Sequence, residues 1–145
     1  MAFTIELFRF IMMINSYEPE LVNIIKYYMN TYTFKTKEEL QEAVNLWCEN
    51  MADALEKYGH ISDWDVSLIT DMSELFRNKT HFNDYIGGWD VSNVTDMSFM
   101  FASAAFFNQD LTQWCVTNFS SMPNTFSYST SALTASNHPV WGTCP

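Results

Sequence analysis

The chain contains few side chains whose type and spacing could support chemistry, and carboxylates are the first candidates. Asp65 and Asp71 recur further along the chain, at one fixed offset, as Asp90 and Asp96. Carboxylates stacked at a fixed interval could share a calcium ion, which binds to clustered oxygen atoms. Helix capping is an alternative for Asp71 and Asp96, because Asp accepts hydrogen bonds from the first free amides of a helix. The third copy has no carboxylate at either position, so the sequence predicts no metal site.

Motifs for other kinds of catalysis are not found in the sequence. The four glycines form no phosphate-binding loop and no nucleophile elbow. His60, His81 and His138 fall at unrelated positions within the repeat described below and lack metal-ligand spacing. We therefore expect neither an enzyme nor a bound cofactor.

The three cysteines are too few for a disulfide framework and lack the spacing of a zinc site. Cys115 and Cys144 each follow a tryptophan of the repeat, in what would be adjacent turns, so their side chains could meet. A bond between them would close a loop of about 30 residues and stabilise the C-terminal end by roughly 3 kcal/mol. The alternative is two buried thiols, but we predict the disulfide. Cys48 follows Trp47 and is interpreted as a core thiol.

An internal repeat must position these residues. Residues 64–76 read WDVSLITDMSELF, and residues 89–101 read WDVSNVTDMSFMF, which matches at nine of 13 positions. Residues 114–126, WCVTNFSSMPNTF, keep the tryptophan, the first valine, the methionine and the last phenylalanine. A fixed period of about 25 residues is typical of proteins in which each unit buries its apolar face against its neighbours.

The repeat predicts an α/β fold, a short right-handed leucine-rich-repeat-like solenoid of about three turns. Alternating apolar residues around each tryptophan predict short strands, which stacking would align as a parallel sheet. Asp71, Asp96 and Ser121 are good N-cap residues, so a short helix should begin at each. The residues that recur should fill the core: Trp64, Val66, Met72, Phe76, Phe82, Trp89, Val91, Met97, Phe101, Phe107, Trp114, Val116, Met122 and Phe126.

Asparagines also recur at fixed positions. Asn83 and Asn108 each follow a repeat phenylalanine and could satisfy backbone groups between turns. Asn93 and Asn118 begin Asn-x-Thr and Asn-x-Ser sequences, which accept glycans in a eukaryotic secretory route. Because they share one repeat position, a structural role in a turn is the simpler interpretation.

Helical patterns precede the repeats. Residues 18–32 carry one apolar stripe after an acidic first turn with an early proline, which predicts a helix. Thr36 and Glu39 form a capping box for a second helix, 37–58, and Gly59 can end it in a left-handed conformation. The chain thus divides into four segments: an N-terminal helical extension (1–34), a capping helix (35–60), two regular repeats (61–113), and a terminal repeat with a C-terminal cap (114–145).

The charge distribution excludes several classes of partner. Seven basic against 17 acidic residues give a net charge of −10, and no Lys or Arg follows Lys79. Nucleic-acid binding depends on cations that neutralise phosphates, so we expect none. No apolar run reaches the roughly 18 residues of a membrane span, so we expect no direct membrane insertion. Residues 1–14 resemble a signal peptide only superficially, because Glu6 and Arg9 interrupt the apolar run. The sequence leaves the cellular compartment open.

With the repeat in view, the chain resembles the BspA-like leucine-rich-repeat surface proteins, whose repeats also occur in mycoplasma lipoproteins. WDVSNVTDMSFMF at 89–101 and FNQDL at 107–111 carry the repeat pattern. The resemblance covers roughly residues 35–145, whereas residues 1–34 fall outside it. It implies a cell-surface or secreted location and a non-catalytic role in adhesion or protein binding.

We expect a non-catalytic scaffold for protein–protein binding or adhesion. Polar residues between the inward positions form the predicted binding surface, which is acidic to neutral and suits a basic or polar protein partner. These residues are Asp65, Ser67, Asp90, Ser92, Thr112, Gln113 and Thr117. One alternative is a structural subunit of a larger homo- or hetero-oligomeric assembly, docked through residues 1–34. Another is a carbohydrate-binding surface, for which Tyr85 and Phe106 are the aromatic candidates outside the core positions.

Overall fold

The structure, a computed structural model, describes residues 31–128 and 131–145. Two α-helices, α3 (Lys37–Glu49) and α4 (Met51–Tyr58), precede the repeats, and two short 3-10 turns lie at Ile61–Asp63 and Ala135–Asn137. Tyr32–Pro145 form one compact unit. Within the described ranges, no helix is long and apolar enough to cross a membrane. The expected helix at 18–32, apart from its last two residues, lies outside the described residues.

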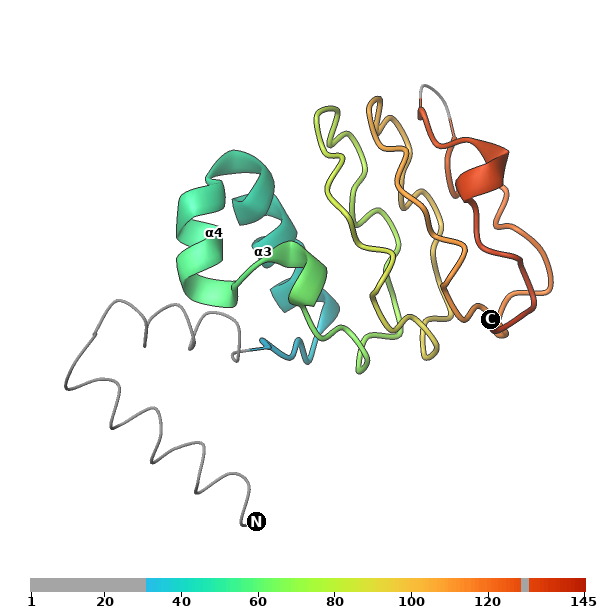
Figure 1. The fold of residues 1–145 in the computed structure, drawn as a ribbon, viewed down its shortest axis with the longest axis horizontal. Coiled ribbons are helices and arrows are strands. Elements are labelled where there is room, and N and C mark those ends of the chain that lie inside the picture. The colour runs from blue at the N-terminus through green and yellow to red at the C-terminus, as the bar shows by residue number, and fades with distance from the viewer. Residues whose placement is uncertain (1–30, 129–130) are drawn as a thin grey trace, which may run out of the picture. The chain divides into compact units, whose positions relative to one another are not determined.

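The predicted α/β solenoid with short parallel strands is wrong. Residues 31–128 and 131–145 contain no strand, and only two isolated bridges, Thr33 with Asp65 and Asp71 with Asp96, have β-type pairing. The helices predicted to begin at Asp71, Asp96 and Ser121 are absent as well. The repeat units instead follow one another as irregular turns of chain, which lie side by side after α4 (Figure 1).

Backbone hydrogen bonding explains why neither strands nor helices form in these turns. Alternate amides, those of Met72, Glu74, Phe76 and Asn78, donate to carbonyls of the next turn. The intervening amides of Leu75 and Arg77 donate to carbonyls of Met72 and Glu74, within their own turn. A helix would use every amide locally, and a strand would use none that way. Two residues of the first turn, four positions apart, have a positive φ, 62° at Glu74 and 61° at Asn78. The equivalent residues of the second turn, Phe99 and Ser103, have a positive φ as well.

Tryptophans join each turn to the one before it. Trp64 and Trp89 stack with their ring centroids 6.3 Å apart and their planes within 16°. The indole Nε1 of Trp89 donates to the carbonyl of Ile61 at 2.8 Å, and that of Trp114 donates to Ile86 at 3.1 Å. Each indole therefore fills the interior while its only polar group is satisfied by the preceding turn.

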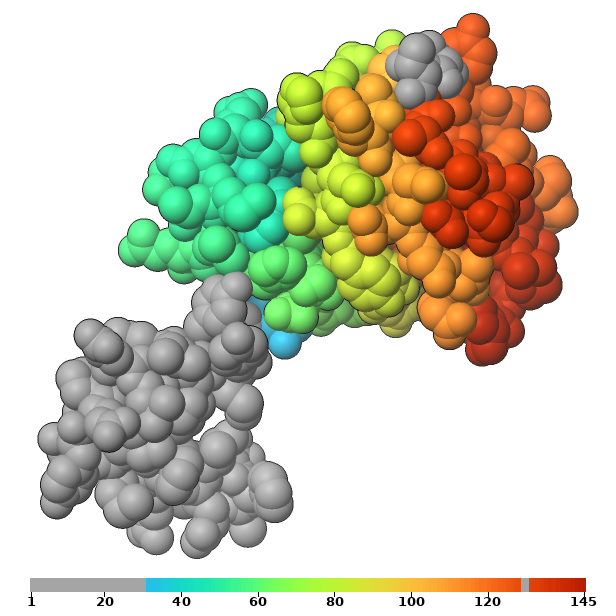
Figure 2. Space-filling view, turned by 45° about the horizontal axis from the view of Figure 1, so that its top comes forward, coloured from blue at the N-terminus to red at the C-terminus, as the bar shows by residue number. Residues whose placement is uncertain are grey.

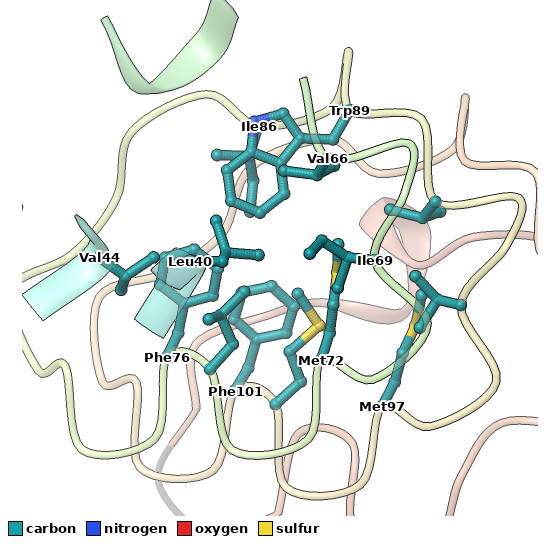
Figure 3. Close-up of a cluster of buried hydrophobic side chains, with 14 of the residues drawn as sticks. Leu40, Val44, Val66, Ile69, Met72, Phe76, Ile86, Trp89, Met97 and Phe101 are labelled. Atoms are coloured by element: carbon teal, nitrogen blue, oxygen red, sulfur yellow. The ribbon is translucent and has the colours of Figure 1, made fainter. Parts of the chain in front are cut away.

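A column of phenylalanines fills the other side of the interior. Phe76 stacks on Phe101 at 5.4 Å, and Phe101 stacks on Phe107 at 4.2 Å, with planes within a few degrees of parallel. Figure 3 shows Phe76 and Phe101 beside Met72 in this cluster. Of the 14 residues that the sequence places in the core, 13 are buried. The described residues bury no charged or polar side chain, so the interior is wholly apolar.

Met122 is the exception, since 41% of it is exposed. In the first two units, an aspartate carboxylate accepts the amide of a serine two residues on, at Ser73 and Ser98. The third unit has Pro123 at the equivalent position, and proline has no amide hydrogen to close this turn. In the described residues, the amides of Met97 and Phe99 donate to no carbonyl of the third turn, and the bonding resumes where the Phe101 amide donates to Phe126. The third turn therefore departs from the second, and Met122 is left uncovered.

The helical segment before the repeats is divided in two. Thr36 caps α3 by accepting the Glu39 amide at 3.2 Å, and Glu39 reaches back to the amide of Lys35 at 3.0 Å. Asn50, at φ −147° and ψ 84°, ends α3 and caps α4, where the sequence predicts one helix over 37–58. Gly59 ends α4 with a φ of 77°. Met51 follows this break and is 46% exposed.

The segment Tyr32–Phe34 lies within the compact unit Tyr32–Pro145 and packs against the first turn. The Phe34 amide donates to the carbonyl of Asp65, and the Asp65 amide donates to Tyr32, both at 2.9 Å. Phe34 is fully buried, and its ring lies 5.0 Å from that of Trp64. The Tyr32 hydroxyl donates to Glu39 at 2.6 Å, and this hydrogen bond to a carboxylate raises the pKa of Tyr32 to about 12. This segment thus covers the first turn.

Residues 131–145 close the other end of the unit, opposite the helices (Figure 2). The Cys115–Cys144 disulfide is present and joins this segment to the third turn. Beside it, the Val116 amide donates to Thr143 at 2.9 Å. Leu133 occupies the core where the repeat has phenylalanine, and the half-buried Trp141 packs on Phe126 at 5.0 Å.

Two adjacent glycines give a matched test of turn packing. A Cβ on buried Gly87 would overlap the backbone carbonyl oxygen of Asp110 in the next turn, whereas on exposed Gly88 its nearest neighbour would be Tyr85, 3.9 Å away. Backbone cannot move aside as a side chain can, so we expect Gly87→Ala to lower the free energy of unfolding by about 1–3 kcal/mol. Gly88→Ala should change it little. Urea unfolding of both variants measures the difference, and equal stabilities would contradict this packing.

Candidate binding surface

Aspartates at fixed repeat positions shape one surface of the turns. Asp65 Oδ1 accepts the Ser67 amide, Asp90 Oδ1 accepts the Ser92 amide, and Asp71 and Asp96 bond in the same way to the serines two residues on, at 2.8–3.0 Å. These carboxylates therefore hold the backbone in local turns. In residues 31–128 and 131–145, no group of three or more potential ligand side chains could hold a metal ion.

Hydrogen bonds favour the ionised form of three aspartates, Asp65, Asp71 and Asp110. Bonds from the hydroxyl and amide of Ser67 lower the pKa of Asp65. At Asp71, burial acts to raise the pKa, but bonds from Ser73 and Lys37 outweigh it and the pKa is lowered. The Thr112 hydroxyl and amide likewise lower the pKa of Asp110.

A folded-state pKa below the unfolded value predicts acid sensitivity. The stabilisation is fully present above the ordinary carboxyl pKa of about 4 and is lost as the pH falls through the lowered folded-state pKa. When the melting temperature is measured from pH 7 downward, it should decrease once the pH is below about 4. The Asp71→Asn variant should show a smaller decrease. The effect will be modest because Asp71 and its partner Lys37 are partly exposed. An identical pH profile for wild type and Asp71→Asn would contradict the assignment.

We define the Asp-turn surface as the exposed parts of residues 65–73, 90–98 and 115–124, which lie in three neighbouring turns. Asparagine side chains hold these segments together: Asn93 Nδ2 donates to the carbonyl of Ser67, and Asn118 Nδ2 donates to that of Ser92, each at 2.8 Å. These bonds give both asparagines the structural role that their shared repeat position predicts. At another edge, Asn83 Oδ1 accepts the Asn108 amide at 2.9 Å.

The structure places most of the predicted binding residues on this surface. Asp65, Ser67, Asp90 and Ser92 lie on it in the first two turns, and Thr117 lies on it in the third. Thr112 and Gln113 come just before Trp114, at its margin. All seven side chains are at least partly exposed. The sequence does not predict the exposed Leu68, which lies among them with 57% of its area accessible.

A hollow of about 370 Å³ opens on the Asp-turn surface where the second and third turns separate. Thr95, Asp96 and Met97 line it from the second turn, and the exposed Met122 lies on the third-turn side. Asp96 is the only charged side chain in its lining. Pro123 lines the hollow on the third-turn side, and the volume of the hollow depends on how far the third turn lies from the second.

A second hollow, of about 330 Å³, lies between the helices and the first turn. Its lining includes Trp47, Cys48, Lys79, His81 and Asp84, and Trp47 Nε1 donates to Asp84 at 2.9 Å. Cys48 is an exposed residue, so the prediction of a core thiol is wrong. Burial of the sulfur nevertheless raises the pKa of Cys48, which makes its thiol a weak nucleophile at neutral pH. Sequence reasoning missed this hollow because its residues come from distant segments.

The aromatic candidates for sugar binding are indeed outside the core. Tyr85 is 49% exposed and Phe106 is 60% exposed. Phe106 stacks on His81 with the ring centroids 5.6 Å apart. The neighbouring amide side chain of Gln109 is already engaged by Asn83, so it is not a free polar partner for a sugar.

These features define a repeat protein with an apolar interior, polar side chains committed to its turns, and an acidic outer surface. The chain belongs to a family described as a Mycoplasma protein of unknown function, DUF285, whose family model matches residues 46–141. The match shows a relation to this mycoplasma family. It does not show the narrower resemblance to the BspA-like leucine-rich-repeat proteins. No curated protein and no solved structure matches the chain.

Proposed function

We propose that this protein is a non-catalytic binding module of a surface-protein type, and that its Asp-turn surface contacts a basic segment of a protein partner. The observation that carries the proposal is the charge of this surface. It presents four aspartates at matched positions in two neighbouring turns, Asp65, Asp71, Asp90 and Asp96, and only Asp71 has an ion-pair partner in the described residues. The chain contains no Lys or Arg after Lys79.

The way the chain uses its polar groups supports a binding role over an enzymatic one. The interior described by the structure is apolar, and the aspartates bond to their own turns. Complementary charge speeds the encounter of partners and helps select among them. An acidic surface with a hollow beside it therefore suits recognition of a basic, partly extended segment.

Panning a random peptide library against the full chain tests this proposal. We expect enrichment of lysine- and arginine-containing peptides whose binding weakens with salt and with Asp90→Asn/Asp96→Asn. The matched control is Glu42→Gln/Glu56→Gln, which removes the same charge from exposed positions of α3 and α4 and should leave binding unchanged. Equal losses in the two variants, or enrichment of peptides without basic residues, would contradict the proposal.

The position of Tyr32–Phe34 shortens the segment through which the chain could dock if it is a subunit of a larger assembly. These residues pack within the repeat unit, so a docking segment would have to lie in residues 1–31. A truncation beginning at Tyr32 is the suitable comparison, because one beginning at Lys35 would also remove the buried Phe34. Light scattering of the full chain and of residues 32–145 would support assembly if only the full chain forms a defined oligomer.

A further inference from the structure

An ammonium group is already bound at one position of the Asp-turn surface. Lys37 extends from the first turn of α3, and its Nζ donates to Asp71 Oδ1 at 2.9 Å and to the Ser73 hydroxyl. Asp71 Oδ1 also accepts the Ser73 amide at 2.8 Å, which fixes the carboxylate in place. We call this pair of oxygen atoms, from an aspartate and the serine two residues on, the ammonium seat.

The second repeat contains the same seat at its equivalent position, Asp96 and Ser98. Asp96 Oδ1 accepts the Ser98 amide at 2.8 Å, the distance found in the first seat. The two seats are held in register because the Met72 amide donates to Asp96 and the Glu74 amide donates to Ser98, at 2.8 and 2.9 Å.

The two seats differ in what the serine hydroxyl does. In the first seat, the Ser73 hydroxyl accepts from Lys37. In the second, the Ser98 hydroxyl donates to its own Asp96 at 2.6 Å. No described residue forms an ion pair with Asp96. The second seat therefore has the geometry of the first and is satisfied by its own hydroxyl.

The surroundings of the second seat fit a lysine side chain. Asp96 lines the hollow between the second and third turns, and the exposed Met122 lies across it. A lysine combines a compact ammonium with a flexible apolar stem, which could lie against Met122. Arginine fits less well, because its planar guanidinium prefers both oxygens of one carboxylate, whereas the ammonium in the first seat uses one carboxylate oxygen and a serine hydroxyl.

We propose that the Asp96–Ser98 seat binds the ammonium group of a lysine side chain from a partner protein, with the lysine stem in the adjacent hollow. This inference rests on the proposed function and specifies its central contact. The chain supplies its own lysine to the first repeat through α3, and the partner supplies one to the second.

Titration of the full chain with acetyl-Gly-Lys-Gly-amide at low salt, followed by amide NMR, tests the seat directly. The Ser98 amide should show a saturable shift, because it donates to the carboxylate that receives the ammonium. The norleucine peptide, which has an uncharged stem, should bind about 3- to 10-fold more weakly, as expected for loss of a charge-assisted hydrogen bond at a partly exposed site. Asp96→Asn, which keeps an acceptor for the turn, should cause a similar loss.

Asp110→Asn is the matched control, since Asp110 forms the same turn with Thr112 at 2.9 Å but lies outside both the Asp-turn surface and the lining of the hollow. It should leave lysine binding within about twofold of wild type, less than the loss of one such bond. A linear, non-saturating shift, equal losses in Asp110→Asn and Asp96→Asn, or stronger binding of the arginine peptide would overturn the lysine assignment.

Vacating the first seat provides a test by gain of binding. Lys37→Met removes the resident ammonium while keeping an apolar stem, so the lysine peptide should now also shift the Ser73 amide saturably. Absence of a Ser73 response would show that the seats do not act alike. If the lysine peptide fails while longer basic peptides still bind in a manner sensitive to Asp90→Asn/Asp96→Asn, this inference fails and the proposed function stands. If those peptides fail as well, both are refuted.

Discussion

Phe107→Ala is expected to lower the free energy of unfolding by about 3–5 kcal/mol, the usual cost of truncating a fully buried phenylalanine. Phe107 is inaccessible to solvent and stacks on Phe101 at 4.2 Å and on Phe82 at 5.5 Å. Its ring therefore contacts residues of both repeats. The irregular turns cannot close around the space it leaves without breaking their hydrogen bonds to each other, so the cavity should persist.

The neighbouring Phe106 supplies a control of identical chemistry. Its side chain is 60% exposed and contacts His81 on the surface, so Phe106→Ala should cost less than about 1 kcal/mol. Chemical denaturation of the two variants, followed by tryptophan fluorescence, measures both effects. Similar losses for Phe106→Ala and Phe107→Ala would mean that the phenylalanine column does not carry the stability assigned to it.

Removal of the Cys115–Cys144 disulfide is expected to cost about 3 kcal/mol, because the bond restricts the unfolded chain. It joins positions with a sequence separation of 29, and closing a loop of this length accounts for a cost of that size. It also joins the C-terminal segment to the third turn, whose bonding to the second is interrupted beside Met97. A Cys115→Ser/Cys144→Ser variant should therefore melt at a lower temperature, with the C-terminal segment exchanging its amide hydrogens first.

Cys48→Ser is the control for this experiment, because Cys48 is exposed and forms no disulfide. Its melting temperature should match that of wild type. Addition of a reducing agent should lower the melting temperature of wild type and of Cys48→Ser, but should not affect the double variant. A wild-type protein that melts identically with and without reductant would contradict the stabilising role of the bond.

The candidate surface could be predicted only in part. The sequence shows that Asp65 and Asp90 occupy equivalent positions, and their side chains are accessible. It does not show that Lys37, from a helix, reaches Asp71, because that contact joins distant parts of the chain through the packing of α3 on the first turn. The hollow beside Asp96 likewise depends on the separation of two turns.

The sequence by itself determined the period of the chain, the inward residues of the first two turns, the cap at Thr36 and the disulfide partners. The period and the inward residues follow from apolar side chains that recur at a fixed interval. The cap follows from the spacing of Thr36 and Glu39, and the disulfide partners follow from two cysteines placed after repeat tryptophans. Only the tertiary structure decided the backbone conformation. Helix and strand patterns were wrong for the turns because alternate amides, such as those of Met72 and Glu74, donate to the next turn while intervening amides bond locally. The tertiary structure also decided the exposure of Met122, because the second and third turns separate beside Pro123.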